Sequence, residues 1–165
     1  MAQHTREGRG EGVKIIIKPS KTADSRTCDW SKVTKEQLLD SSKQHIGDIG
    51  KGFDFFIELM QRQKYIHDLT KINDIDGFFE DFRTGFKRQV WWEEHQRKER
   101  HHFNNPEFIQ DDINLVDVID QIIDGVMAGM ARSGEYRQER IDGELLLKAY
   151  ANTVKLLLDQ IEMAK

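Results

Sequence analysis

Residues 34–63, TKEQLLDSSKQHIGDIGKGFDFFIELMQRQ, decide the fold class of this chain. Apolar side chains recur there at intervals of three and four residues, which is the spacing of one face of an α-helix. Thr34 and Gln37 have the spacing of a capping box that would start such a helix. Three glycines between residues 47 and 52 each lower helix propensity by about 1 kcal/mol relative to alanine, which indicates close packing or a kink. We predict a long helix that begins at Thr34 and ends near Gln63.

Helical spacing continues over most of the chain that follows. The sequence predicts a short helix or turn and then three long helices, at residues 65–73, 75–101, 111–132 and 142–163. Only two prolines occur, so long helices are permitted. Seven phenylalanines on these helices are predicted to lie in the core: Phe53, Phe55, Phe56, Phe78, Phe79, Phe82 and Phe86.

The segment before the first helix has a different character. Residues 1–12 carry several glycines and no apolar periodicity, which indicates a flexible tail. Residues 13–19, VKIIIKP, form a β-branched run that predicts one short strand or extended arm. A lone strand needs a partner, which the domain itself or a second copy in a homodimer could supply. We predict an all-α helical bundle at residues 34–165, preceded by an extended arm and irregular segment at 13–33.

Composition excludes several classes of protein. Of the 165 residues, 38% are hydrophobic and 33% charged, which is apolar enough for a folded core and too polar for a membrane protein. No apolar run approaches the roughly 18 residues of a membrane span. The net charge of -4 argues against general nucleic-acid binding. A single cysteine, Cys28, excludes an intramolecular disulfide and a cysteine-built zinc site. We expect a soluble, cytoplasmic protein.

The histidines point to chemistry, because five of the six lie between residues 45 and 102. The sharpest segment is YIHDLTKI, residues 65–72, in which His67 and Asp68 are adjacent and Lys71 follows about one helical turn later. An imidazole nitrogen and a carboxylate oxygen side by side could both reach one divalent metal ion if the backbone bends there. The alternative interpretation is a packed histidine beside an acidic residue at a helix start.

Other possible ligands lie one helix away on either side of this pair. His45 lies upstream, while His95, His101 and His102 lie downstream, with His95 and His102 seven residues apart on one helix face. The helix predicted at 111–132 carries three aspartates on one face, Asp117, Asp120 and Asp124. A solvated acidic stripe would look the same. Asp120 and Asp124 lie nearer its apolar edges, so we retain these two as candidate ligands.

The order His45, His67-Asp68, His95, His101-His102 and Asp120 or Asp124 resembles the HD-domain superfamily of metal-dependent phosphohydrolases. Members of that superfamily are helical bundles whose metal ligands come from several helices. The resemblance implies an HD-like fold, with His45 as the first motif histidine and His67-Asp68 as the namesake pair. Either Asp120 or Asp124 would be the closing aspartate, and the later histidines would hold a second metal.

A closer resemblance is to a small, poorly characterised HD-like family of bacteria and phages. Its members pair an "HDxSK" segment with a tryptophan-bearing "W…H…N-HH" segment and a later acidic helix. This chain has the corresponding segments HDLTK at 67–71 and WEEHQRKERHH at 92–102. It departs from the pattern at Thr70 for the usual serine, at Arg100 for the asparagine and at Gly125 for a tryptophan.

The resemblance implies a metal-dependent phosphohydrolase that acts on a nucleotide or related phosphoester. Nitrogen and oxygen ligands suit one or two ions of Mn, Fe, Co, Ni or Zn. The implied metal ligands are His45, His67, Asp68, His101, His102, Asp120 and Asp124.

The same hypothesis assigns the catalytic and substrate-binding groups. Lys71 would contact the phosphate, and His95 would be the general acid. Arg97 and Arg100 would attract the anionic substrate, although an ordinary solvated helix end would also explain them. Of two adjacent tryptophans one is expected in the core, which leaves Trp92 to stack on a base. The alternative function is a catalytically inactive HD-like protein that binds a partner protein as an interaction or inhibitor module.

Overall fold

The computed structural model describes residues 14–20, 22, 25–136 and 140–164, and within these residues the chain is mostly helical, as predicted. The predicted flexible tail at residues 1–12 lies outside the described residues. The chain is divided into two compact units. The first unit contains Met1–Phe56 and Leu156–Lys165, and the second unit contains Ile57–Lys155. None of the described helices is both long enough and apolar enough to span a membrane.

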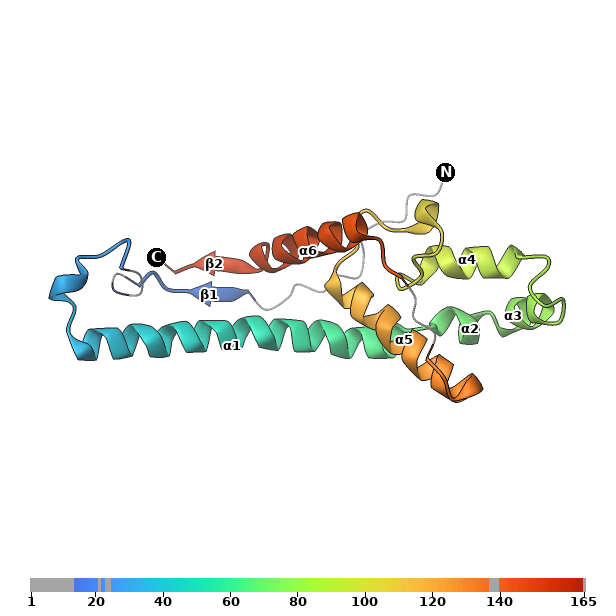
Figure 1. Cartoon of the computed structure of the whole chain (residues 1–165), viewed down its shortest axis with the longest axis horizontal. Helices are drawn as coiled ribbons and strands as arrows, with labels where there is room; N and C mark the ends of the chain where they lie inside the picture. The colour runs from blue at the N-terminus through green and yellow to red at the C-terminus, as the bar shows by residue number, and fades with distance from the viewer. Residues whose placement is uncertain (1–13, 21, 23–24, 137–139, 165) are drawn as a thin grey trace. The chain divides into compact units, whose positions relative to one another are not determined.

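The predicted arm is a strand whose partner lies within the first unit (Figure 1). Strand β1 (Ile15–Ile17) pairs in parallel with strand β2 (Ile161–Met163), with Ile15 opposite Ile161 and Ile17 opposite Met163. The prediction that the last helix continues to residue 163 was therefore wrong. Helix α6 (Gly143–Leu158) ends in a turn at Gln160, because the next three residues give their backbone groups to β1.

Helix α1 (Lys35–Ile66) begins as the sequence predicts. The amide of Thr34 donates to Oε1 of Gln37 over 3.0 Å, and the amide of Gln37 donates to Oγ1 of Thr34 over 3.2 Å, which forms the capping box. Within the first unit, a polar face of α1 binds the arm. Gln44 donates to the carbonyl of Lys18, and Lys51 donates to the carbonyl of Ile16.

The second unit does not contain the single long helix predicted at residues 75–101. That segment is divided between helix α3 (Ile75–Phe82) and helix α4 (Val90–Lys98), as Figure 1 shows. The backbone is left-handed at Phe86 and Gln89, with φ of 58° and 54°, which an α-helix does not tolerate. Buried Asp81 stabilises the break, because its carboxylate accepts from the amides of Gln89 and Trp92, each over 3.1 Å, at the start of α4.

Short helix α2 (Leu69–Asn73) precedes α3, and helix α5 (Leu115–Ser133) follows α4. Helix α5 begins later than predicted, because Asn114 and Asp117 form a capping box at its start. A small core surrounds Ile113, Val118 and Ala149 in the second unit. The phenylalanines predicted in the core are partly exposed, and Phe53, Phe79 and Phe82 each expose more than half of their surface: 66%, 54% and 60%.

Candidate metal centre

The His67-Asp68 pair lies at the junction between α1 and α2. Helix α1 ends at Ile66, and Asp68 adopts a left-handed backbone with φ of 57° before α2 begins. A non-glycine residue in this conformation costs about 1–2 kcal/mol, so its surroundings must hold it there. The bend brings Nε2 of His67 to 3.4 Å from Oδ2 of Asp68. This is the bent backbone that a shared ligand role for the two residues requires.

Glu99, which directly follows α4, holds that bend. Its carboxylate accepts from the amide of Asp68 over 3.2 Å and from the amide of Thr70 over 3.1 Å. The hydroxyl of Thr70 also donates to it over 2.6 Å. Glu99 is buried, and the end of a helix is an unfavourable place for an acid. The side chain therefore serves the start of α2 rather than its own helix.

The same hydroxyl fixes the orientation of His95. Oγ1 of Thr70 lies 2.6 Å from Nδ1 of His95, and because the hydroxyl already donates to Glu99, it accepts from this nitrogen. The other nitrogen, Nε2, therefore carries no proton when the ring is neutral. It lies 2.9 Å from Nε2 of His102 and 3.5 Å from Oδ1 of Asp68. A hydrogen bond that fixes the proton on one ring nitrogen, and leaves the lone pair of the other pointing into the site, is the usual support of a metal-binding histidine.

Helix α5 contributes its acids through an inward-facing side. Oδ1 of Asp120 lies 2.9 Å from Nδ1 of His67, and its Oδ2 lies 3.3 Å from Nδ1 of His101. Gln63 on α1 donates to Asp120 over 2.6 Å. Asp124, one turn later, is 3.8 Å from Nε2 of His67. Since Asp117 and Asp120 are buried, the predicted acidic stripe is not a solvated surface.

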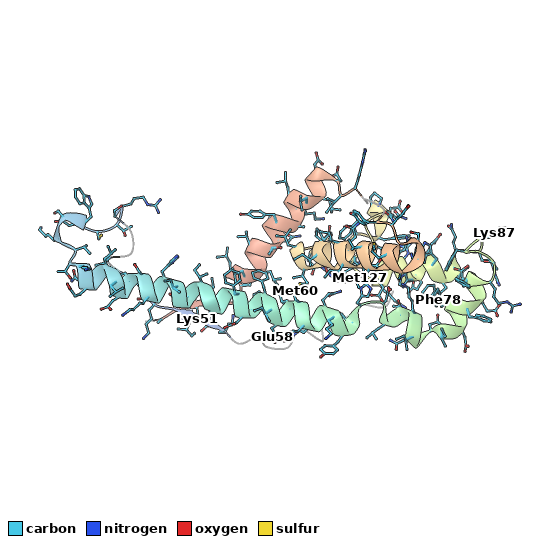
Figure 2. All side chains as sticks on the ribbon, turned by 60° about the horizontal axis from the view of Figure 1, so that its bottom comes forward. Lys51, Glu58, Met60, Phe78, Lys87 and Met127 are labelled. Carbon is cyan, nitrogen blue, oxygen red and sulfur yellow. The ribbon has the colours of Figure 1, made fainter. Side chains whose placement is uncertain are left out.

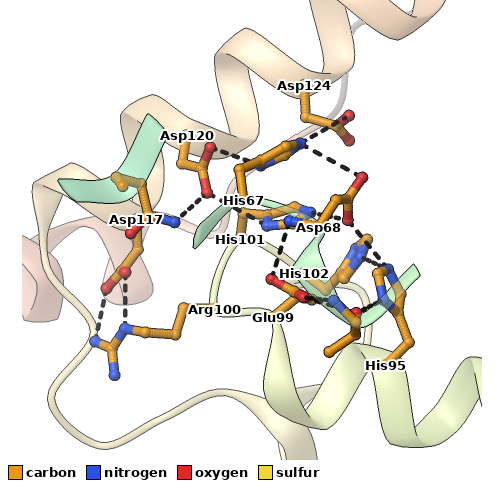
Figure 3. A network of polar contacts seen from close by, with 12 residues as sticks. His67, Asp68, His95, Glu99, Arg100, His101, His102, Asp117, Asp120 and Asp124 are labelled. Atoms are coloured by element: carbon orange, nitrogen blue, oxygen red, sulfur yellow. Dashed lines mark hydrogen bonds and ion pairs between the residues drawn. The ribbon is translucent and has the colours of Figure 1, made fainter. Parts of the chain in front are cut away.

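Figure 3 shows these side chains pointing toward one another from the junction between α1 and α2, from α4, from α5 and from the segment after α4. Each group of possible ligands has its donor atoms within 4.8 Å of one another. The described residues form four such groups: His67 with His101 and Asp120, Asp68 with His101 and His102, His67 with Asp68 and Asp124, and Asp68 with His95 and Glu99.

Several buried polar atoms in this cluster have no hydrogen bond. They are Nδ1 of His67, Oδ1 of Asp68 and both ring nitrogens of His101. Nδ1 of His67 and of His101 face Asp120 closely without forming a hydrogen bond. A buried polar atom without a partner costs about 1–3 kcal/mol, so such a concentration needs an explanation. A divalent cation could bind one ring nitrogen of His101 together with an atom of His67 or of Asp68. The donor set therefore fits a metal ion, although the two nitrogens of the His101 ring point in opposite directions and cannot face the same ion.

The pKa shifts of most of these groups favour the protonation states that bind a metal ion, which are the ionised carboxylate and the neutral imidazole. Burial would raise the pKa of Asp68, but Lys71 and the neighbouring histidines outweigh it and hold that pKa below its usual value. Burial, together with nearby Lys71 and His101, lowers the pKa of His95 to about 4. Burial and the two neighbouring histidines lower the pKa of His102 to about 3. These two rings are neutral at physiological pH and present lone pairs.

His101 is the exception, because its pKa is raised, whereas the pKa of its neighbour Asp120 is lowered. Burial lowers the pKa of His101, but contact with Asp120 and the charges of Asp68 and Asp124 raise it overall. Burial raises the pKa of Asp120, but His101, Gln63 and His67 lower it overall. His101 therefore binds a proton more readily than a free imidazole does, and a cation in the cluster would compete with that proton.

The other predicted site residues have varied surroundings. Lys71 forms an ion pair with Asp68 inside the cluster. Trp92 is half-buried with its ring stacked on His95, while Trp91 is buried against Phe78, so one of the adjacent tryptophans is core, as predicted.

Three of the predicted residues take no part in the ligand groups. His45 belongs to the first unit, is exposed on α1, and occurs in none of the four ligand groups. Arg97 lies over the ring of Phe108 at 3.9 Å. Arg100 is held by Asp117 and Asp112, with nitrogen–oxygen distances of 2.8 Å.

Three residues of the cluster were not predicted from the sequence: Gln63, Thr70 and Glu99. Glu99 lies four residues after His95, so the two share a helix side, but this spacing is common in solvated helices. Thr70 lies within the HDLTK segment and was noted only as a departure from the usual serine. Its hydroxyl, which serine also carries, is the group that makes the contacts.

Comparison of the chain with protein-family models, curated proteins and solved structures finds no match. The resemblance to the HD-domain superfamily therefore rests on the residues quoted from the sequence, and the geometry of the cluster is the independent observation on which a function can be argued.

Proposed function

We propose that the second unit binds one or two divalent metal ions and hydrolyses a phosphoester, with a nucleotide as substrate, in the cytoplasm. The observation that carries this proposal is the set of four buried nitrogen and oxygen atoms of His67, Asp68 and His101 that lie close to one another or to Asp120 without a hydrogen bond. Asp120, Asp124, His95 and His102 surround those atoms with further donors. His67, Asp68 and Asp120 follow one another in the order that the resemblance to HD phosphohydrolases implies, but His45, the first histidine of that order, is exposed and belongs to none of the ligand groups.

Two overlapping groups of residues could each hold a cation. His67, His101 and Asp120 form one group, and Asp68, His101 and His102 form the other. His101 belongs to both, and its neutral ring has one nitrogen free of a proton, so it would serve one cation at a time. Mixed nitrogen and oxygen donors suit Mn, Fe, Co, Ni or Zn. When bound, such an ion would lower the pKa of a water molecule and neutralise charge on a phosphate.

The remaining groups support binding and proton transfer. Lys71 is half-buried, and its ammonium group already contacts Asp68, so a phosphate at the centre would lie within its reach. Trp92 offers a ring beside the cluster on which a base could stack. Nε2 of His95 lies beside Nε2 of His102, and the pKa of about 4 keeps the His95 ring neutral at physiological pH. We therefore assign His95 to accepting a proton rather than to the general-acid role that the sequence hypothesis gave it. We leave Arg100 out of this substrate site, because Asp112 and Asp117 occupy its guanidinium group.

The proposal is tested by measuring metal content and phosphate release together. The full chain is purified and its metals are counted by elemental mass spectrometry, for the wild type and for Asp120→Asn. Asp76→Asn, an exposed aspartate on α3, is the matched control. Each protein is then offered a panel of mono-, di- and trinucleotides with added Mn²⁺, Co²⁺ or Zn²⁺.

We expect about one metal ion or more per chain and phosphate release in the wild type and in the Asp76 variant, with both lost in Asp120→Asn. Metal binding without activity on any phosphoester would support the proposed metal site and refute the proposed hydrolase activity. A wild type that takes up no added metal would refute the proposal as a whole.

The second candidate is a catalytically inactive protein that binds a partner, and α5 is the observation in its favour. Because its acids face inward, several large apolar side chains on α5 remain exposed, including Ile122 at 53% and Met127 at 65%. Absence of metal uptake would move our preference to this second function.

A further inference from the structure

The longest helix leaves an apolar face uncovered. Five side chains of α1, each between 49% and 69% exposed, form what we call the apolar stripe: Leu39, Ile46, Ile49, Phe53 and Ile57. At 100° per residue these side chains lie within a sector of about 80°. They extend over about 27 Å of helix. Soluble proteins rarely leave a continuous apolar strip of this length in contact with water.

The stripe is uncovered because the arm occupies the opposite side of α1. Ser41, Gln44 and Lys51 contact the segment that includes β1, through Ser20, Lys18 and Ile16. These three residues project roughly opposite to the stripe by the same helical geometry. Lys51, labelled in Figure 2, belongs to this polar side. The chain therefore covers the polar side of the helix and leaves its apolar side available.

The spacing of the stripe is that of a helix–helix seam. Leu39, Ile46 and Phe53 are seven residues apart, and Ile49 and Phe56 continue the seam three residues after Ile46 and Phe53. Apolar residues in this alternation of three and four are typical of two helices packed side by side. The surface is therefore shaped for another helix rather than for a small molecule.

A second row of residues runs along one edge of the stripe. Lys43, Gly47, Gly50 and Asp54 follow one another at intervals of four, three and four residues. Lys43 and Asp54 are exposed, and neither forms an ion pair with any residue that the structure describes. A Cβ atom added at Gly47 or Gly50 would meet no atom within 4 Å outside the helix itself. Nothing within the described chain therefore explains these two glycines or the two charges.

All of these features are centred on the same point of the helix, between residues 48 and 49. The apolar stripe, the two glycines and the Lys43–Asp54 pair each extend equally on both sides of it, to within one residue. A two-fold axis through that point would lay a second α1 antiparallel on the first. It would place Lys43 of each copy opposite Asp54 of the other and the glycines at the crossing, where helix backbones come closest.

We propose that α1 of one chain pairs antiparallel with α1 of a second copy through the apolar stripe. A parallel pair would not bring Lys43 near Asp54 of the partner helix, so the charges favour the antiparallel arrangement. The proposal does not depend on the metal centre, which lies in the second unit.

The first test is the association state of the full chain, measured by sedimentation velocity over a wide range of protein concentration. We expect the wild type to be a dimer, and the double variant Ile46→Glu/Phe53→Glu to be a monomer. Both side chains are exposed within one chain, so circular dichroism should show unchanged helix content. Leu147→Glu, at an apolar residue of α6 that is 70% exposed, is the matched control and should remain a dimer.

The second test fixes the direction of pairing. Lys43→Glu alone would place Glu opposite Asp54, and Asp54→Lys alone would place two lysines together. Each single variant should therefore dissociate roughly tenfold more readily, or more, than the wild type. When the two variants are mixed, each new charge meets its opposite on the other chain, so a heterodimer should form with close to wild-type affinity.

Three results would overturn the proposal. The first is a wild type that remains monomeric at every concentration, which would assign the stripe to a different partner. The second is a dimer that survives Ile46→Glu/Phe53→Glu or is dissociated instead by Leu147→Glu. The third is failure of the mixed charge variants to associate better than each variant alone, which would exclude the antiparallel pair.

Discussion

Replacing Glu99 by glutamine tests whether this carboxylate holds the bend of the candidate metal centre. Glu99 accepts three hydrogen bonds from the start of α2, through the amides of Asp68 and Thr70 and the hydroxyl of Thr70. Glutamine has nearly the same size, but only one of its two terminal atoms can accept a hydrogen bond. At least one backbone amide would therefore face an NH₂ group instead of an oxygen.

The expected loss of stability follows from the bonds involved. A hydrogen bond to a charged group contributes about 1.5–3 kcal/mol, and the bonds that survive become neutral and weaker. We therefore expect Glu99→Gln to lower the free energy of unfolding by about 2–4 kcal/mol. This is a large fraction of the 5–15 kcal/mol that is typical of a folded domain. Because the left-handed backbone of Asp68 loses its support, we also expect metal affinity to fall by roughly tenfold or more.

The assay is equilibrium unfolding in urea, followed by tryptophan fluorescence with a chelator present, so that stability and metal binding are separated. Glu94→Gln is the matched control, because Glu94 lies on the same helix and makes only an exposed pair with Lys98. That pair contributes less than about 0.5 kcal/mol. The two variants therefore make the same chemical change in different surroundings.

The sign of the change in the free energy of unfolding distinguishes the two possible roles of Glu99. If Glu99 were merely an acid near the end of α4, neutralising it would remove an unfavourable interaction with the helix dipole and stabilise the protein by about 0.3–1 kcal/mol. A Glu99→Gln variant as stable as Glu94→Gln, or more stable than the wild type, would show that Glu99 does not hold the backbone of Asp68 and Thr70 in place.

Further outcomes follow from the same geometry. Thr70→Val should weaken metal binding by roughly tenfold to a hundredfold in a chelator-competition assay, whereas Thr70→Ser should bind nearly normally because it keeps the hydroxyl beside His95. The pKa of His102 is depressed to about 3, so the unfolded chain takes up a proton that the folded chain refuses as pH falls below about 6.5. His102 should then contribute a decrease of up to about 1.4 kcal/mol per pH unit to the free energy of unfolding of the metal-free protein between pH 6.5 and 3. His95 should contribute similarly down to about pH 4, so His102→Asn should reduce the slope in acid titrations without removing it. Arg100→Met should destabilise the protein by about 3–5 kcal/mol in urea unfolding, because it leaves the buried carboxylate of Asp117 without its cation. The metal content should be unchanged. A loss of metal would contradict our conclusion that Arg100 and Asp117 are not part of the candidate metal centre.

The helical class and the start of α1 could be predicted from the sequence because both depend on local patterns. The capping residues Thr34 and Gln37 act over one turn, and apolar spacing reports a helix without any tertiary information. The break between α3 and α4 depends on Asp81, whose side chain caps a helix that begins several residues later. The end of α6 depends on β1, which lies at the other end of the sequence. Contacts of this range leave no local signal.

The candidate site divides along the same line. His67 and Asp68 are adjacent in the sequence, so their proximity was easy to predict, and the helical spacing of Asp120 and Asp124 marked one face of α5. Which way that face points is decided by the rest of the second unit, and the aspartates face inward although Ile119 and Ile122 on the same helix remain exposed. The supporting role of Glu99 requires the position of α2 relative to α4, which no spacing rule supplies.

The parallel pairing of β1 with β2 has a consequence for how the protein is made. During synthesis, Ile15–Ile17 emerges from the ribosome long before Ile161–Met163 is made. At about 5–20 residues per second, the early strand waits roughly 7–30 s for its partner. Throughout that interval its backbone donors and acceptors are open to other nascent chains. A premature stop codon, or a protease that cuts after α6, would remove β2 and leave β1 exposed permanently. Loss of β2 should therefore cause aggregation through β1.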